Sequence, residues 1–212
     1  MILLIGANGS MGKRYQAILR YLGKDFRAVD KETRGSLLAS AAIRCSSAII
    51  ATPTQTHEEV ISTLIPSRIP ILCEKPVTKN LKALDEILST VKKNKTPFQM
   101  VAQYKVLVQP DRIGRTRYDY FRHGNDGLVW DCMQIIALAR GEVSLHEESP
   151  VWSCMINGQA LKIQDMDAAY IAFIQNWLNN PNGDLGWIRT AHEKTKAEND
   201  ALFSQSVSED LK

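Results

Sequence analysis

Three glycines at three-residue spacing follow the first apolar segment of the chain, and they restrict its fold more than any other feature. Residues 2–5 are apolar throughout, and the turn Gly6-Ala7-Asn8-Gly9-Ser10-Met11-Gly12 leads from them into a helical pattern. In such a strand-turn-helix unit the glycines allow a tight turn, close approach of a phosphate to the backbone, and close packing of helix on strand. We therefore predict a pyrophosphate-binding loop made by Gly6, Asn8, Gly9, Ser10, Met11 and Gly12.

The first hundred residues alternate short apolar runs with helical patterns, as expected for βαβ units around a parallel sheet. The expected strands are residues 2–5, 26–29, 48–51, 69–73 and 98–102. Apolar side chains recur at helical spacing between them, which predicts helices around residues 11–22, 60–65 and 81–91. Thr56 and Glu59 have the spacing of a capping box for the second of these helices. Right-handed crossovers then favour an α/β fold with a Rossmann-type doubly wound parallel sheet.

The pattern changes after Gln103, where we expect a second, smaller α+β domain built on an antiparallel sheet. Strands are predicted at residues 105–108 and 115–121, a helix at 129–139, and a hairpin from residues 151–156 and 160–163 turned by Asn157-Gly158. Two closing helices are predicted at residues 167–178 and 188–203. The expected organisation is a dinucleotide-binding domain at 1–103 and a shortened substrate and oligomerisation domain at 104–212.

The composition is that of a globular chain, with 44% hydrophobic and 23% charged residues and a formal net charge of +3. Basic and acidic residues are interleaved, so neither nucleic acid nor a membrane surface is implied as a partner. The only local basic run, Lys92, Lys93 and Lys95, fits a solvated helix end. The four cysteines are far apart and have no histidine at metal-ligand spacing, which argues against a metal site and a disulfide framework and favours a reducing cytoplasm.

An acidic residue closes the second expected strand. Asp30 lies where a carboxylate can accept hydrogen bonds from the adenosine ribose hydroxyls, which favours NAD(H). Lys31 and Arg34 follow it and could serve the 2′-phosphate of NADP(H) instead. Both cofactors therefore remain open, with NAD(H) favoured.

Two further motifs follow the third and fourth expected strands. They read Ala51-Thr52-Pro53-Thr54-Gln55-Thr56-His57 and Cys73-Glu74-Lys75-Pro76-Val77. Together with the glycine turn they resemble the Gfo/Idh/MocA oxidoreductase family, whose members carry a TPxxxH and an EKP segment at these points. The resemblance covers residues 1–103 and implies NAD(P)-dependent hydride transfer to or from a sugar or a similar small polar substrate, with frequent oligomers through the second-domain sheet.

The resemblance also implies roles for individual residues. Thr52 and Pro53 should line the cofactor near the nicotinamide, Glu74 should lie on its ribose side, and Lys75 should point into the substrate cleft. Independently of the family, a lysine at the end of a central strand, followed by a proline with fixed φ, lies where doubly wound folds bind ligands. Lys75 could donate a proton to the substrate oxygen, or orient the carboxamide or ribose. His57 either packs and hydrogen-bonds locally or touches the cofactor.

Beyond residue 103 the chain departs from the family pattern. Residues 127–138 occupy the place of the family's substrate-site helix, which often reads D-x-G-x-H-x-x-D. Asp131 is present, but no histidine follows it, and Gln134 cannot replace one because an amide does not titrate near neutral pH. We take Lys75, Gln134 and Asp131 as the catalytic candidates, with the upstream His123 as an alternative acid-base group.

Three functions remain open at this point. The first is oxidation or reduction of a sugar or sugar derivative, and the second is reduction of an imine or a linear tetrapyrrole, which needs no such histidine. The third is an NAD(P)-binding protein without turnover, favoured by Gln134 and the short second domain. The intact Glu74-Lys75-Pro76 segment favours an enzyme. A homo-oligomer is expected because the small second sheet would otherwise expose an apolar face.

Overall fold

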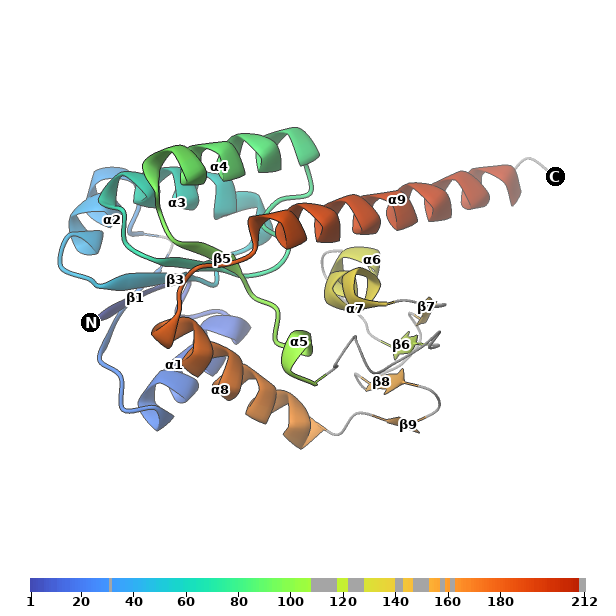
Figure 1. The fold of residues 1–212 in the computed structure, drawn as a ribbon, viewed down its shortest axis with the longest axis horizontal. Coiled ribbons are helices and arrows are strands. Elements are labelled where there is room, and N and C mark those ends of the chain that lie inside the picture. Colours follow the sequence, from blue (N-terminus) through green and yellow to red (C-terminus); the bar gives the residue numbers. More distant parts are fainter. Residues whose placement is uncertain are drawn as a thin grey trace. The chain divides into compact units, whose positions relative to one another are not determined.

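The structure is a computed structural model, and it describes residues 1–30, 32–107, 118–121, 128–139, 143–146, 153–156, 159–160 and 163–209. Its contacts divide the chain into two compact units (Figure 1). The first unit consists of Met1–Val101 and Tyr170–Ile188, and the second of Ala102–Ala169 and Arg189–Lys212. We expected a single boundary after residue 103. The contacts also assign the C-terminal segment Tyr170–Ile188 to the first unit.

A five-stranded parallel sheet forms the centre of the first unit. Its strands are β1 (Ile2–Ile5), β2 (Phe26–Val29), β3 (Ser47–Ile50), β4 (Ile71–Cys73) and β5 (Phe98–Met100), in the order β2-β1-β3-β4-β5. All four neighbouring pairs are parallel. The predicted Rossmann-type parallel sheet is therefore confirmed. The strand order reverses between β1 and β3, and at such a point the carboxyl ends of the strands leave a crevice in which ligands bind.

Helices cover both faces of this sheet. Figure 1 shows α2 (Gly35–Ala42), α3 (His57–Leu64) and α4 (Leu81–Asn94) on one face, and α1 (Ser10–Tyr21) on the other. The sequence patterns predicted α1, α3 and α4 but did not indicate α2.

The ends of the helices have local causes. Gly23 has a φ of 62° just after α1, a conformation that glycine adopts without strain. Asn80 caps α4, because its side chain accepts hydrogen bonds from the backbone N–H groups of Lys82 at 2.9 Å and Ala83 at 3.3 Å. The capping box predicted for α3 is wrong: the Thr56 hydroxyl donates to the Pro53 carbonyl at 2.8 Å instead.

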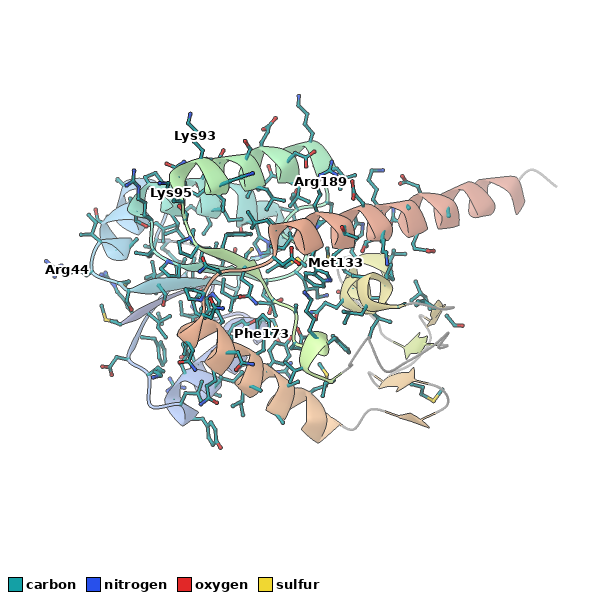
Figure 2. All side chains as sticks on the ribbon, viewed as in Figure 1. Arg44, Lys93, Lys95, Met133, Phe173 and Arg189 are labelled. Carbon is teal, nitrogen blue, oxygen red and sulfur yellow. The ribbon has the colours of Figure 1, made fainter. Side chains whose placement is uncertain are left out.

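The basic run lies at the end of α4. Lys92 and Lys93 are exposed in its last turn, where positive charge complements the helix dipole, and Lys95 is the exposed residue that ends the helix. The side chain of Lys93 extends away from the ribbon (Figure 2). These lysines have the solvated position that the sequence indicated.

The C-terminal segment Tyr170–Ile188 contributes to the core of the first unit. It contains the end of α8 (Ile163–Asn179) and the beginning of α9 (Leu185–Glu209), two helices that extend beyond their predicted limits. Phe173, Ile174 and Trp177 are buried. The backbone N–H of Gly183 donates to the carbonyl of Phe98 in β5 at 3.1 Å, and a Cβ atom at Gly183 would collide with that carbonyl. A glycine therefore lets this segment lie directly against the last strand of the sheet.

The second unit contains a four-stranded sheet in the order β7-β6-β8-β9. Its strands are β6 (Tyr118–Phe121), β7 (Val143–His146), β8 (Ser153–Ile156) and β9 (Gln159–Ala160). The pairs β6-β8 and β8-β9 are antiparallel, as the predicted hairpin requires, but β6 and β7 are parallel. The described strands thus form a mixed sheet instead of the purely antiparallel one that we expected. The predicted turn at residues 157–158 lies outside the described residues.

Two predictions for the helices of this unit need correction. Residues 105–107, expected in a strand, lie in the short helix α5 (Tyr104–Leu107). The single helix expected at 129–139 is divided into α6 (Leu128–Asp131) and α7 (Met133–Leu138), with a turn at Cys132 between them. Strand β7 was not predicted.

Candidate functional site

The glycine turn links the end of β1 to the start of α1. Gly6 has a φ of 83°, and a Cβ atom there would lie 2.6 Å from the carbonyl oxygen of Ala51. A Cβ atom at Gly12 would collide with the Gly6 carbonyl and lie 2.7 Å from the carbonyl carbon of Ala7. Both glycines are therefore required by the packing of the protein itself.

Gly9 differs from the other two glycines. A Cβ atom there would lie 3.4 Å from the Gly6 oxygen and 3.8 Å from the Ala51 oxygen, which are ordinary contact distances. The backbone at Gly9 is extended, with a φ of −68°, so the fold does not require a glycine at this position. Gly9 instead leaves open the side of the turn that faces a pocket.

The start of α1 is suited to an anion. No side chain caps the helix, and its first turn, which begins with Ser10 and Met11, contains no acidic residue. Backbone N–H groups and the positive end of the helix dipole favour a negatively charged group at such a helix start. Pyrophosphate binding by the glycine turn stays a prediction.

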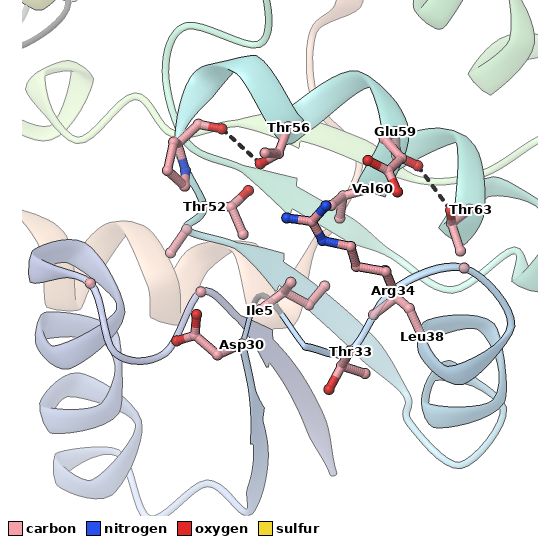
Figure 3. A pocket seen from close by; sticks show the side chains of 15 residues that line it. Ile5, Asp30, Thr33, Arg34, Leu38, Thr52, Thr56, Glu59, Val60 and Thr63 are labelled. Carbon is pink, nitrogen blue, oxygen red and sulfur yellow. Dashed lines mark hydrogen bonds between the residues drawn. The ribbon is translucent and has the colours of Figure 1, made fainter.

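A pocket of about 340 Å³ lies next to the turn, at the carboxyl ends of β1 and β3 (Figure 3). Its volume falls within the range of small-molecule sites. Six of the residues that line it bear on cofactor binding: Gly6, Gly9, Asp30, Arg34, Thr52 and Pro53. The pocket thus lies at the point where the strand order reverses, as expected for a doubly wound sheet.

Two charged side chains of opposite sign contribute to this pocket. Asp30 follows β2, and its Oδ2 atom accepts a hydrogen bond of 2.7 Å from the backbone N–H of Asn8. This bond attaches the carboxylate to the glycine turn. Arg34 precedes α2, and its side chain extends across the pocket towards α3 (Figure 3). Lys31, also expected near the cofactor, lies outside the described residues.

Thr52 supplies a test of whether the pocket fits a polar ligand. It lines the pocket, and its hydroxyl oxygen is one of the buried side-chain atoms that find no hydrogen-bond partner in the described part of the chain. Leaving such a group unsatisfied costs about 1–3 kcal/mol. A rotation about the Cα–Cβ bond of Thr52 would bring the hydroxyl to a polar ligand group in the pocket. The open side of Gly9 and the Thr52 hydroxyl therefore both fit a dinucleotide cofactor.

Glu74 is buried directly after β4, and both of its carboxylate oxygens accept hydrogen bonds. The hydroxyl of Tyr15 donates to Oε1 at 2.5 Å, and the backbone N–H of Lys75 donates to Oε2 at 3.0 Å. Burial and the neighbouring Glu74 raise the pKa of Tyr15 well above its ordinary value of 10.0, so its hydroxyl remains a donor. Sequence reasoning placed Tyr15 on the apolar face of α1 and missed this contact.

The EKP segment continues with Lys75, which is half-buried, and a cis peptide bond joins it to Pro76. His57 connects this segment to the TPxxxH segment. Its ring nitrogens lie 2.9 Å from the Pro76 carbonyl oxygen and 2.8 Å from the Thr52 carbonyl oxygen, and the side chain is buried. This geometry favours the local hydrogen bonding considered from the sequence over direct contact with a cofactor.

The two catalytic candidates beyond residue 103 lie in the second unit. Gln134 is buried, its side-chain N–H₂ group donates to the Gln103 side-chain oxygen at 2.7 Å, and its own oxygen accepts from the backbone N–H of Tyr104 at 3.2 Å. Both ends of the amide are therefore engaged within the protein. Asp131 is buried at the end of α6. The alternative acid-base group His123 lies outside the described residues.

A histidine that sequence reasoning did not single out lies in the same unit. His192 is fully buried in α9, and its ring centroid lies 6.3 Å from that of Trp130. Nothing in the sequence distinguishes it from other residues of a closing helix, because its spacing to Trp130 arises only in the fold.

The described residues provide neither a metal site nor a membrane-spanning helix. They contain no cluster of three histidine, cysteine or acidic side chains able to hold a metal ion. Within the same part of the chain, no helix combines the length and apolar character needed to cross a membrane. Cys45, Cys73 and Cys132 are buried, and none of these three cysteines is part of a disulfide in the described part of the chain.

The parallel sheet, the glycine turn after β1 and the pocket at the switch point define a dinucleotide-binding Rossmann unit. Residues 25–102 match the sequence model of the GFO_IDH_MocA family, described as an oxidoreductase family with an NAD-binding Rossmann fold. This match covers two of the three motifs from which the resemblance to the family was inferred, the TPxxxH and EKP segments.

Solved structures of dehydrogenases share the fold. A myo-inositol dehydrogenase from Corynebacterium glutamicum has a TM-score of 0.69 and 14% identity, over 92% of this chain and 94% of the other. A UDP-N-acetylglucosamine 3-dehydrogenase from Acidithiobacillus ferrooxidans has a TM-score of 0.71 and 11% identity, over 92% and 95%. A dehydrogenase from Clostridium difficile has a TM-score of 0.73 and 12% identity, over 94% and 98%. No curated protein sequence matches the chain.

Proposed function

We propose that this protein transfers a hydride between NAD(H) and a small polar substrate, a sugar or a sugar derivative. The observation that carries the proposal is the pocket at the switch point, which is lined both by Gly9 of the glycine turn and by Thr52, whose hydroxyl has no hydrogen-bond partner in the described part of the chain. The substrate class is supported by the similar structures, which include dehydrogenases named for myo-inositol and for UDP-N-acetylglucosamine.

The residues indicate how the cofactor would lie. The pyrophosphate would accept hydrogen bonds from the N–H groups of the glycine turn, because these groups begin an uncapped helix. The adenosine ribose would lie towards Asp30, at the end of β2, and the nicotinamide half towards Glu74, on the other side of β3. A bound nicotinamide supplies the hydride or accepts it.

Cofactor preference depends on the two charged side chains of the pocket. The Asp30 carboxylate is fixed next to the glycine turn by Asn8 and would repel a 2′-phosphate. Arg34 would attract one, but it reaches towards α3. We therefore infer that NADH binds more tightly than NADPH.

Lys75 is the proposed proton donor or polarising group for the substrate oxygen, because it lies in the segment fixed by Glu74. Gln134 would transfer no proton, because its amide bonds to Gln103 and Tyr104 and does not titrate near neutral pH. Asp131 remains a candidate acid-base group. We also propose a homo-oligomer that covers one face of the second-unit sheet.

A two-stage experiment tests the proposal. Fluorescence titration with NADH and NADPH measures cofactor binding, and we expect binding with a preference for NADH. Absorbance at the NADH band then follows turnover across inositols, aldoses, UDP-sugars, a cyclic imine and biliverdin. Turnover of the imine or biliverdin alone would replace the sugar with the alternative substrate class. Failure of both nucleotides to bind would refute the proposed function.

A further inference from the structure

Tyr15 connects the helix that begins at the glycine turn to the end of β4. Its side chain is fully buried in α1, and its hydroxyl lies 2.5 Å from Oε1 of Glu74. Neither the glycine motif nor the EKP motif includes Tyr15. The hydrogen bond nevertheless joins the elements that carry these two motifs.

The direction of this hydrogen bond is fixed. Because burial and the Glu74 charge raise the pKa of the Tyr15 hydroxyl well above 10.0, the hydroxyl keeps its proton and donates. The other Glu74 oxygen accepts from the Lys75 backbone N–H at 3.0 Å. Glu74 is thus held by α1 through one oxygen and by the start of the Lys75-Pro76 segment through the other.

The ring of Tyr15 is itself supported from the C-terminal segment. Tyr170 in α8 packs edge-on against it, with the ring centroids 6.2 Å apart and the planes at 77°. The guanidinium of Arg14 lies 5.1 Å from the centroid of the Tyr170 ring. These contacts restrict the position from which Tyr15 can donate.

We propose that Tyr15 is a positioning residue for the nicotinamide half of the cofactor site, acting through Glu74 on Lys75. The inference rests on the proposed function. The pocket extends from Asp30 at the end of β2, where the adenosine half would lie, to Thr52 after β3, whereas Glu74 follows β4, the next strand beyond β3. Loss of the Tyr15 hydroxyl therefore affects the nicotinamide half and spares the adenosine half.

The test compares two nucleotides that share the adenosine half. Tyr15→Phe keeps the ring that packs on Tyr170 and removes only the hydroxyl. We expect its affinity for NADH to fall about tenfold, the effect of one hydrogen bond to a buried charged group, and its affinity for ADP to change by less than about twofold. Tyr21→Phe is the matched control, because Tyr21 lies in the same helix but is 75% exposed. This control should change neither affinity.

A second variant keeps the test decisive if Tyr15→Phe does not fold. Glu74→Gln still accepts from Tyr15 but presents an amide N–H₂ group to the Lys75 N–H, so it should also weaken NADH selectively. Where Tyr15→Phe does fold, the double variant should bind NADH no more weakly than the single variant with the lower NADH affinity, because both changes break the same connection.

The possible outcomes separate this inference from the proposed function. If the wild-type protein binds neither NADH nor ADP, the proposed function fails, and the inference fails with it. If the wild type binds both and the single variants lose both affinities equally, Tyr15 is structural. Unchanged NADH affinity in folded variants would also overturn the inference while leaving the proposed function in place.

Discussion

Substitution of the second and third glycines of the turn by alanine separates cofactor binding from folding. At Gly9 a methyl group meets only ordinary contacts, the nearest at 3.4 Å, and the extended backbone accepts alanine. At Gly12 the same methyl group collides with the Gly6 carbonyl and with the backbone of Ala7. Backbone atoms cannot rotate away as a side chain can. Gly9→Ala should therefore fold, whereas Gly12→Ala should move α1 away from β1.

The expected magnitudes differ accordingly. The new methyl group in Gly9→Ala occupies the side of the turn where the pyrophosphate would approach. Loss of one or two hydrogen bonds to a charged group costs about 2–3 kcal/mol, so NADH affinity should fall about 30- to 150-fold. The free energy of unfolding should change by less than about 1 kcal/mol. In Gly12→Ala it should fall by about 3 kcal/mol, with a Tm lower by about 10 °C.

Fluorescence titration with NADH and thermal unfolding of the ligand-free protein measure the two effects. Gly23→Ala is the control, because Gly23 has a φ of 62° and nothing within 4 Å of its Cβ position. This variant should lose about 1 kcal/mol of stability through backbone strain and bind NADH normally. Full NADH affinity in a folded Gly9→Ala protein would show that the pyrophosphate does not bind at the turn.

Further predictions concern catalysis, cofactor choice, pH and assembly. Lys75→Met should reduce kcat about 10²- to 10⁴-fold on an identified substrate without a large change in NADH affinity, and full turnover would exclude Lys75 as proton donor. Asp30→Ser should reduce the preference for NADH over NADPH, measured as the ratio of the two Kd values. An unchanged ratio would show that residues other than Asp30 determine the cofactor preference. Burial raises the pKa of Cys73 above its ordinary value of 9.0 and the pKa of Tyr15 above its ordinary value of 10.0. Both groups therefore stay protonated in the folded protein at pH values where they ionise in the unfolded chain. Unfolding free energy should therefore fall above about pH 9, by about 1.4 kcal/mol per pH unit for each group, with a smaller slope above pH 10 in Tyr15→Phe. Sedimentation at micromolar concentration should give a dimer or larger assembly, and a monomer would contradict the proposed oligomer.

The first unit was predictable because its local signals agree with one another. The runs at residues 2–5 and 48–51 are apolar throughout, as strands covered on both faces must be, and the structure buries every residue of β1 and β3. The glycine turn, Asp30 and the TPxxxH segment then follow strands whose carboxyl ends meet at one edge. For these residues sequence position fixes spatial position, because parallel strands bring their ends together.

The errors lie where short segments carry little periodic information. Residues 105–108 contain too few positions to distinguish an apolar strand from one helical turn, and the structure forms α5 at Tyr104–Leu107. Helix α2 has eight residues and several alanines and serines, so its apolar face is weak. The parallel pairing of β6 with β7 depends on a strand that no alternation pattern indicated.

Contacts between distant segments explain why the site could be located but not fully described. Tyr15 has the spacing of a core residue in α1, and only the fold brings its hydroxyl to Glu74, 59 residues away. Gly183 lies in a segment that resembles an ordinary turn, yet its lack of a side chain lets the C-terminal segment Tyr170–Ile188 lie against β5. Motif residues can be recognised in the sequence because their chemistry is needed at the end of a strand. A residue that supports a motif residue, as Tyr15 supports Glu74, can be recognised only from its contact in the fold. The segment Tyr170–Ile188, which supplies Tyr170 to pack against Tyr15, is therefore the part of the first unit that the motifs alone do not reveal.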